Sequence, residues 1–379
     1  MARKVLNNGE TASSFRGKLN DNFEELYETA ADDPSNYWYG FEMTVGQTDS
    51  QVTKIKGDGV PTGAHPVSDK FYPAVVNEYG TINYELNPNN LTQKKDGTAA
   101  DLSGADGDAM TVKPEYYIKF ELDGSTLRFK ETPYPLEGFT RVAKHMDGIY
   151  PADEDGNGKM RSRSGVTALT NKTRSYYRSI ASAKGNGWCM TPYFWYMSDY
   201  FTAVSYFGNL NSQEFIGEGA TNASSGDWSD YNGYYPVWTT DGSAASSYGS
   251  GTVTSTPANA NEANLVNGQI PVTVNSWGDG TKTLNTNIAV MWWLRDVFGH
   301  TFEWQDGINI NYTSTAAEVY ISKNPADFAD DTTTNYEKLA DIAENTGYIS
   351  EFVSGTILPT VGGVAGSGSG HCGDRHYSP

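Results

Sequence analysis

Acidic residues at alternate positions near the middle of the chain are arranged as in a calcium-binding loop. Asp153, Asp155 and Asn157 precede Gly158 with the spacing of the first half of an EF-hand, whose oxygen ligands fold around one cation. Ser164 stands where the bidentate glutamate of such a loop belongs. An acidic glycine-rich turn without a metal is the competing interpretation. A structural calcium ion is therefore the one cofactor that the sequence raises.

Two other groups of polar residues have the right types for chemistry but not the right spacing. Four potential metal ligands lie between His371 and His376, yet their spacing matches no zinc signature. Glu303 and Asp306 are a carboxylate pair of the kind that glycoside hydrolysis needs, but three residues of separation do not place them across a substrate. The chain also lacks a Ser-His-Asp motif, a phosphate-binding glycine loop and a dinucleotide fingerprint. We predict no enzymatic activity and no catalytic residues.

The composition excludes several classes of partner. The 379 residues include 46 Asp and Glu against 27 Lys and Arg, for a net charge of -19. This charge repels phosphate backbones and anionic lipids, so we predict no nucleic-acid partner. No apolar run is long enough to span a membrane, and the first residues lack the apolar core of a signal peptide, so we predict no membrane insertion. Abundant glycine, tyrosine and small polar residues are typical of loop-rich β proteins.

The N-terminal segment, residues 1–32, predicts a short amphipathic helix. Because a helix of this length is marginal alone, its apolar stripe must be buried against another surface. Read as heptads, the stripe forms a seam with one asparagine, which can set the number of chains in an oligomer. Docking of the helix onto its own chain is the alternative. The anchor and oligomerisation residues are Phe15, Leu19, Asn22, Phe23 and Leu26.

Residues 33–139 predict a β-rich shoulder or shaft domain, because alternating apolar segments at 37–45, 116–120 and 125–131 are separated by Asp-Gly turns. Residues 140–379 predict the last domain. It begins with helices at 172–183 and 193–207, and Thr191 with Pro192 marks the start of the second helix. That helix is aromatic nearly all round, so we expect it to be buried.

A long polar stretch, residues 222–282, contains aromatic side chains among Ser, Gly and Asn. Rigid rings beside adaptable polar groups are typical of binding loops, and connections of this length are usually functional or disordered. The competing interpretation is that these rings fill the domain core or a subunit interface. The predicted ligand-binding residues are Trp228, Tyr231, Tyr234, Tyr235 and Trp238.

The segment from Gly299 to Ile310, GHTFEWQDGINI, resembles the GN-x-W-E-W-x-x-G signature of C-type-lectin-like domains of the formylglycine-generating-enzyme type. The resemblance makes Gly299, Glu303, Trp304 and Gly307 fold residues. It does not extend to that enzyme's activity, which uses a closely spaced cysteine pair to bind copper. This chain has only Cys189 and Cys372, which are far apart in sequence.

Two further segments are similar to parts of phage virion proteins. Residues 9–27 resemble the opening of virion fibre proteins, and residues 107–139 resemble a module that precedes the lectin-like domain. Together the three segments imply a fibre protein similar to receptor-binding proteins of the major-tropism-determinant type. Its fold class would be α+β and β-rich, with an anchor helix, a β-rich middle domain and a C-type-lectin-like domain at 140–379.

The same resemblance implies the partners. The N-terminus would attach the protein to other virion proteins, and the last domain would bind a glycan or protein on the host surface. A homotrimer is the preferred assembly, and the virion is the expected location. The alternatives are a structural head-fibre or capsid decoration protein that binds no host ligand and, third, a glycan-degrading enzyme.

Overall fold

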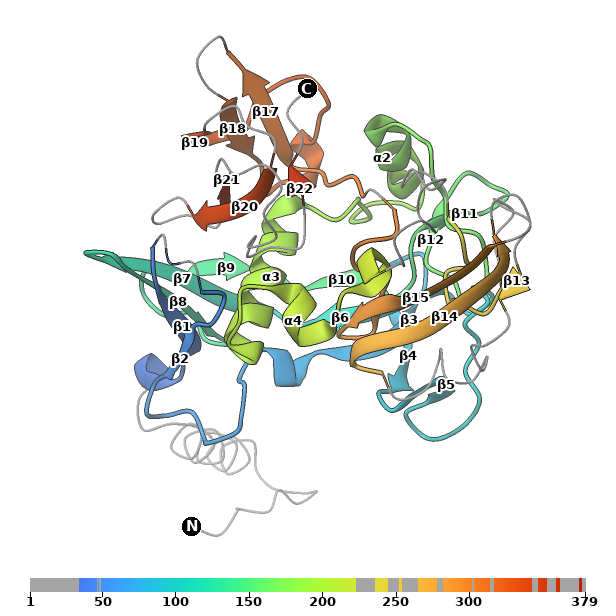
Figure 1. Ribbon diagram of the computed structural model, residues 1–379, viewed down its shortest axis with the longest axis horizontal. Coiled ribbons are helices and arrows are strands. Elements are labelled where there is room, and N and C mark those ends of the chain that lie inside the picture. The colour runs from blue at the N-terminus through green and yellow to red at the C-terminus, as the bar shows by residue number, and fades with distance from the viewer. Residues whose placement is uncertain are drawn as a thin grey trace, which may run out of the picture.

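The computed structural model covers most of the chain between residue 34 and the C-terminus (Figure 1). It describes residues 34–45, 47, 49–222, 236–244, 252–253, 265–277, 282–301, 303–313, 317–342, 347–352, 359–361 and 375–376. The predicted anchor helix, with Phe15, Leu19, Asn22, Phe23 and Leu26, lies outside these residues. Within them, no helix is long and apolar enough to cross a membrane.

The described part is β-rich, with antiparallel sheets and few helices, which confirms the predicted β-rich class. Two five-stranded sheets form its larger part. The first has the order β2 (Thr53–Lys56), β1 (Tyr39–Thr44), β8 (Thr126–Thr132), β7 (Tyr116–Asp123), β9 (Thr140–Val142). The second has the order β10 (His145–Gly148), β6 (Asp108–Lys113), β3 (Tyr72–Val76), β4 (Ile82–Asn87), β5 (Asn90–Lys94).

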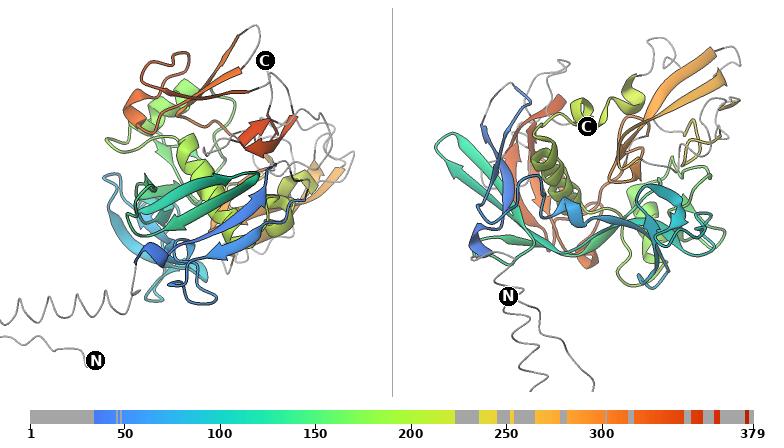
Figure 2. Two further views of the ribbon diagram at one scale, coloured as in Figure 1. Left: turned by 90° about the vertical axis from the view of Figure 1, so that its left-hand side faces the viewer. Right: turned by 90° about the horizontal axis from the view of Figure 1, so that it is seen from below.

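Smaller sheets complete the β structure. They are β11 (Asp153–Glu154) with β12 (Met160–Arg161); β13 (Thr252–Val253), β14 (Asn267–Trp277), β15 (Lys282–Met291) and β16 (Leu294–Arg295); β17 (Ile308–Tyr312), β18 (Ala317–Ile321) and β19 (Glu337–Ile342); and β21 (Pro359–Val361), β20 (Gly347–Phe352) and β22 (Arg375–His376). Short 3-10 turns lie at Pro34–Asn36, Ser68–Lys70, Gly219–Asn222 and Pro325–Asp327. Figure 2 shows the β14–β15 hairpin on the far side of α3 (Tyr193–Phe207) from the first sheet.

Three α-helices are described: α2 (Arg174–Ser182), α3 and the short α4 (Ser212–Ile216). The predicted helix at 193–207 is therefore correct in its bounds. Its predicted cap is wrong, because Pro192 is the N-cap and no side chain caps the helix. Instead, the amide of Tyr193 donates to the carbonyl oxygen of Asp306 at 2.8 Å. In α2, the hydroxyl of Thr173 accepts from the amide of Tyr176.

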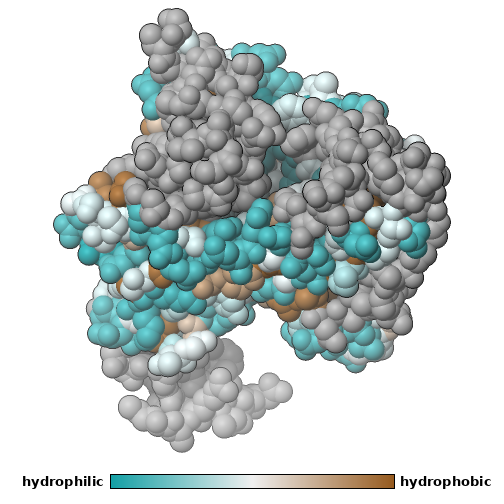
Figure 3. Space-filling view, viewed as in Figure 1, coloured by the Kyte–Doolittle hydropathy of each residue, from teal (hydrophilic) through white to brown (hydrophobic). Residues whose placement is uncertain are grey.

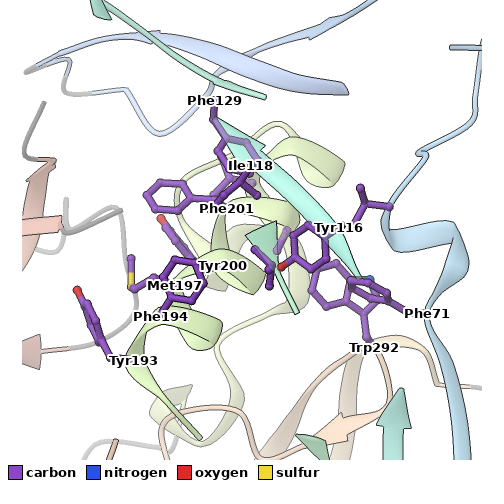
Figure 4. Close-up of a cluster of buried hydrophobic side chains, with 14 of the residues drawn as sticks. Phe71, Tyr116, Ile118, Phe129, Tyr193, Phe194, Met197, Tyr200, Phe201 and Trp292 are labelled. Atoms are coloured by element: carbon purple, nitrogen blue, oxygen red, sulfur yellow. The ribbon is translucent and has the colours of Figure 1, made fainter. Parts of the chain in front are cut away.

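Helix α3 packs on the first sheet through aromatic rings (Figure 4). Phe201 is fully buried, and its ring centroid lies 4.9 Å from that of Phe120 and 5.5 Å from that of Phe129. Of the fifteen residues of α3, eleven are buried, which agrees with the predicted burial of this aromatic helix. The largest core cluster includes residues of β1, β7, β8 and α3, together with Trp292 and Val319.

The predicted boundary at residue 139 falls inside the two large sheets. Strand β9 pairs with β7, and β10 pairs with β6, although both β9 and β10 follow residue 139. The predicted middle and last segments thus share two sheets and one core. The predicted division into a middle domain and a last domain stays a prediction.

Because Phe201 joins helix and sheet, we expect Phe201→Ala to lower the free energy of unfolding by about 3–5 kcal/mol. Leu122 on β7 is exposed, so Leu122→Ala is the matched control and should cost about 0.5 kcal/mol or less. Denaturant unfolding measures both variants. If both variants lost the same free energy of unfolding, the packing of Phe201 on the first sheet would not be a main source of stability.

Candidate functional site

A cleft of about 560 Å³ lies beside α3. Its lining includes residues of β10, β12, α2 and β16, the loop before α3, and Thr301, Glu303, Trp304 and Gln305. Backbone hydrogen bonds join the start of α3 to Asp306, the residue after Gln305: besides the Tyr193 bond, the amide of Asp306 donates to the carbonyl oxygen of Thr191 at 3.2 Å. Four residues of the GHTFEWQDGINI segment therefore border the cleft. Its volume falls in the range of small-ligand sites.

Two strongly exposed aromatic rings lie at this cleft. The coloured residues on the face seen in Figure 3 are largely hydrophilic. Large apolar side chains are exposed at five described positions. The two most exposed are Tyr79, at 82%, and Trp304, at 55%, and both line the cleft. The indole Nε1 of Trp304 donates to the carbonyl oxygen of Lys172 at 3.1 Å, which orients the ring. Exposed, oriented rings of this kind provide contact area for a ligand.

The signature residues do not behave as one set. The side chains of Glu303 and Trp304 are exposed, and their assignment as fold residues stays a prediction. Gly299 is also exposed and has a φ of 90°, which favours glycine. Gly307 fits the fold role: it has a φ of 71°, and a Cβ atom there would lie 2.6 Å from the carbonyl oxygen of Ser322.

Four charged side chains form a buried ion cluster at the cleft: Lys113 of β6, His145 and Asp147 of β10, and Asp199 of α3. Lys113 Nζ lies 2.5 Å from Asp199 Oδ2 and 2.8 Å from Asp147 Oδ2. His145 Nε2 lies 3.3 Å from Asp199 Oδ2, and Nδ1 lies 2.9 Å from the carbonyl oxygen of Ala143. Both imidazole nitrogens face acceptors, so both carry protons. Two cations then balance two carboxylates.

The pKa shifts follow from this arrangement. Burial alone lowers the pKa of His145, but the nearby Asp199 and Asp147 carboxylates outweigh burial and raise the pKa above its ordinary value. For Asp199, burial raises the pKa, but Lys113 and His145 reverse the effect and hold it below its ordinary value. The cluster is therefore an ion-pair network at neutral pH.

His145, Asp147 and Asp199 also form the one described group of three side chains close enough to hold a metal ion, with ligand atoms within 4.8 Å of one another. The sequence prediction missed these residues, because they come from distant segments. The Lys113 ammonium group already lies between the two carboxylates, where it supplies the positive charge. A usable signal was Asp199, the one charged residue of a helix rich in aromatic residues.

The predicted calcium ligands belong to the β11–β12 hairpin. Arg163 Nε donates to both carboxylate oxygens of Asp153, at 3.2 and 3.0 Å. Asp155 Oδ1 accepts from the amides of Asn157, at 2.8 Å, and Lys159, at 3.0 Å. Calcium would have to displace the Arg163 guanidinium group. Calcium binding at this turn and the metal-free turn both stay predictions.

Of the predicted ligand-binding residues, only Trp238 lies in the described part of the chain; Trp228, Tyr231, Tyr234 and Tyr235 lie outside it. Trp238 is 1% exposed. Its Nε1 donates to Asp296 Oδ2 at 3.1 Å, and its ring stacks on His300 with centroids 3.7 Å apart. The prediction of a ligand-binding Trp238 is therefore corrected: its ring fills the core, as in the alternative interpretation.

The other residues with catalytic potential are separated. Asp306 is fully buried, and its carboxylate accepts from Arg178 Nε at 2.6 Å and Nη2 at 2.8 Å. Glu303, by contrast, is exposed at the cleft. Burial raises the pKa of the Cys189 thiol to about 12, so the thiol stays protonated at neutral pH.

No protein-family model, curated protein or solved structure matches this chain. The resemblance to phage fibre proteins and to C-type-lectin-like domains therefore stays a prediction.

We expect His145→Gln to change how stability depends on pH. The folded-state pKa of His145 is raised above the ordinary value of 6.5, so its protonated form contributes stability that is fully present below pH 6.5. That contribution is lost as pH rises through the folded-state pKa. Glutamine keeps a donor for Asp199 but carries no charge.

The measurement is the free energy of unfolding of both proteins between pH 5 and pH 9. The wild-type protein should be more stable than the variant, and the difference should be largest at the acidic end, about 1–3 kcal/mol. Parallel stability curves would contradict a protonated His145 in the folded protein.

Proposed function

We propose that the protein is a fibre-like protein of a phage virion, which attaches the particle to a glycan or protein on the host-cell surface through a lectin-like region. Its N-terminal segment would fix it to other virion proteins. This proposal rests on the three sequence segments that resemble fibre proteins and on their order along the chain.

The single structural observation that supports attachment is the convergence of Tyr79 and Trp304 on one cleft. Exposed aromatic rings that border a cleft offer apolar contact area to a ligand, and tyrosine and tryptophan are enriched in binding sites. The apolar faces of sugar rings stack on aromatic planes, while the polar groups of the cleft supply hydrogen bonds to hydroxyl groups.

A homotrimer would strengthen attachment without a higher affinity of each binding site. Three linked sites raise the effective concentration of the second and third binding events, so the avidity exceeds the affinity of one site. The acidic surface has a net charge of -19 per chain, which also disfavours nonspecific adhesion to anionic surfaces.

Replacing both rings tests the binding role. We expect Tyr79→Ala with Trp304→Ala to weaken binding of the purified protein to host cells about tenfold or more, because buried aromatic anchors carry much of the binding energy. Tyr206→Ala is the control, since Tyr206 is exposed outside the cleft. Flow cytometry with labelled protein measures binding. Unchanged binding by the double variant, with all three proteins melting alike, would contradict attachment through this cleft.

Location on the particle separates attachment from a structural role. Immunogold electron microscopy with antibody against residues 140–379 should label projecting fibres at the tail. Label over the capsid would favour the decoration or head-fibre alternative. Particles without label would contradict the virion proposal.

We further expect intact protein to sediment as a particle of three chains, because the predicted N-terminal seam must be buried against partners. Analytical ultracentrifugation at several concentrations measures this. A single-chain sedimentation coefficient at every concentration would contradict the trimer and favour docking of the helix onto its own chain.

A further inference from the structure

The exposed ring of Trp304 is held at the cleft through helix α2. A side chain that is 55% exposed keeps much of its rotamer freedom unless a specific contact removes it. The indole Nε1 of Trp304 makes such a contact, because it donates to the carbonyl oxygen of Lys172 at 3.1 Å. Lys172 directly precedes Thr173, the N-cap of α2. The orientation of the ring therefore depends on where α2 lies relative to the loop that carries Trp304.

Helix α2 also holds the backbone of that loop, through Asp306. Asp306 follows Trp304 by two residues and is fully buried. Its Oδ2 accepts from Arg178 Nε at 2.6 Å, and its Oδ1 accepts from Arg178 Nη2 at 2.8 Å. Arg178 lies within α2. One helix thus contacts the Trp304 loop at two points, one at the ring and one at the chain just after it.

The ion pair between Arg178 and Asp306 has a fixed geometry. A buried carboxylate is tolerated only when its charge and its oxygen atoms find partners. The planar guanidinium group supplies two donors at once, which sets both the distance and the direction of approach, whereas a lysine supplies the charge alone. Arg178 Nη2 also donates to Asp330 Oδ1 at 2.8 Å, so the guanidinium group is itself held from a second side.

The main chain of Asp306 joins the same loop to the start of α3. The amide of Tyr193 donates to its carbonyl oxygen, and its own amide donates to the carbonyl oxygen of Thr191. Arg178 therefore acts where α2, α3 and the Trp304 loop meet. Neither Arg178 nor Asp306 is among the residues that line the cleft.

We infer that Arg178 is a positioning residue for ligand binding: through Asp306 it fixes the loop that presents Trp304 to the cleft. The inference rests on the proposed attachment function. A ring that is already in place when the ligand arrives loses less conformational freedom on binding, so the affinity is higher. Loss of the forked contact between Arg178 and Asp306 should therefore weaken binding, although Arg178 does not line the cleft.

The first test is a double-mutant cycle on the full-length protein, with host-cell binding measured by flow cytometry. We expect Arg178→Lys and Trp304→Ala each to weaken binding about threefold to tenfold. If Arg178 acts through Trp304, adding Arg178→Lys to Trp304→Ala should cause no further loss. Losses that multiply in the double variant would show that Arg178 acts independently of Trp304 and would overturn the inference.

Arg163→Lys is the matched control. Arg163 Nε donates to both oxygens of the buried Asp153, and the Arg163 side chain is 23% exposed against 20% for Arg178. Arg163 also lies outside the cleft lining. Both lysine variants should lose stability in denaturant unfolding, because each replaces a forked ion pair, but only Arg178→Lys should weaken binding. Equal losses of binding would assign the effect to stability alone and overturn the inference.

The second test follows the Trp304 ring directly and needs no ligand. The chain has nine tryptophans, so in protein labelled with fluorotryptophan the fluorine NMR signal that is missing from Trp304→Phe belongs to Trp304. We expect Arg178→Lys to shift or broaden this signal and Arg163→Lys to leave it unchanged. Asp306→Asn removes the charge but keeps the side-chain size, and it should also move the signal. It replaces Arg178→Lys if that variant does not fold.

The outcomes separate the inference from the proposed function. Host-cell binding that Arg178→Lys leaves unchanged overturns the inference and leaves attachment intact. A Trp304 signal that neither Arg178→Lys nor Asp306→Asn moves also overturns it. Wild-type protein that does not bind host cells contradicts the proposed attachment function, whereas the fluorine signal still decides whether Arg178 positions Trp304 at the cleft.

Discussion

The ion cluster around Lys113 is the constraint on which the arrangement of this molecule depends. Burying four charges is costly, and the cost is offset only while each charge keeps its partner at contact distance. Lys113 and Asp147 belong to the second sheet, and Asp199 belongs to α3. On its other side, α3 holds the first sheet through Phe201. Helix α3 therefore contacts both sheets. Its ion pairs reach the second sheet, and its aromatic rings pack on the first.

Short-range patterns predicted the features that depend on short-range physics. The bounds of α3 followed from its aromatic run and from the proline before it, because a proline is compatible with a helix start but not with its interior. The β-rich class followed from alternation and Asp-Gly turns. Even here, the cap was misassigned, since the helix start is satisfied by the carbonyl oxygen of Asp306, more than one hundred residues later.

The site was beyond such patterns because its members meet only in the folded chain. His145, Asp147 and Asp199 come from two elements, and Lys113 comes from a third. Trp238 illustrates the same limit: it was placed on a binding loop, and its side chain is buried in the core. The sequence identifies an aromatic residue, but long-range packing decides whether its side chain is buried or exposed.

The shared sheets also constrain how this chain can evolve. Strands β9 and β10 complete sheets whose other strands precede residue 139. A gene segment exchanged by recombination at that point would deliver two edge strands from a foreign parent to β7 and β6. A mismatch would leave open sheet edges, which promote aggregation. We therefore expect an exchange at residue 139 to be tolerated only where the new β9 and β10 match β7 and β6 of the other parent.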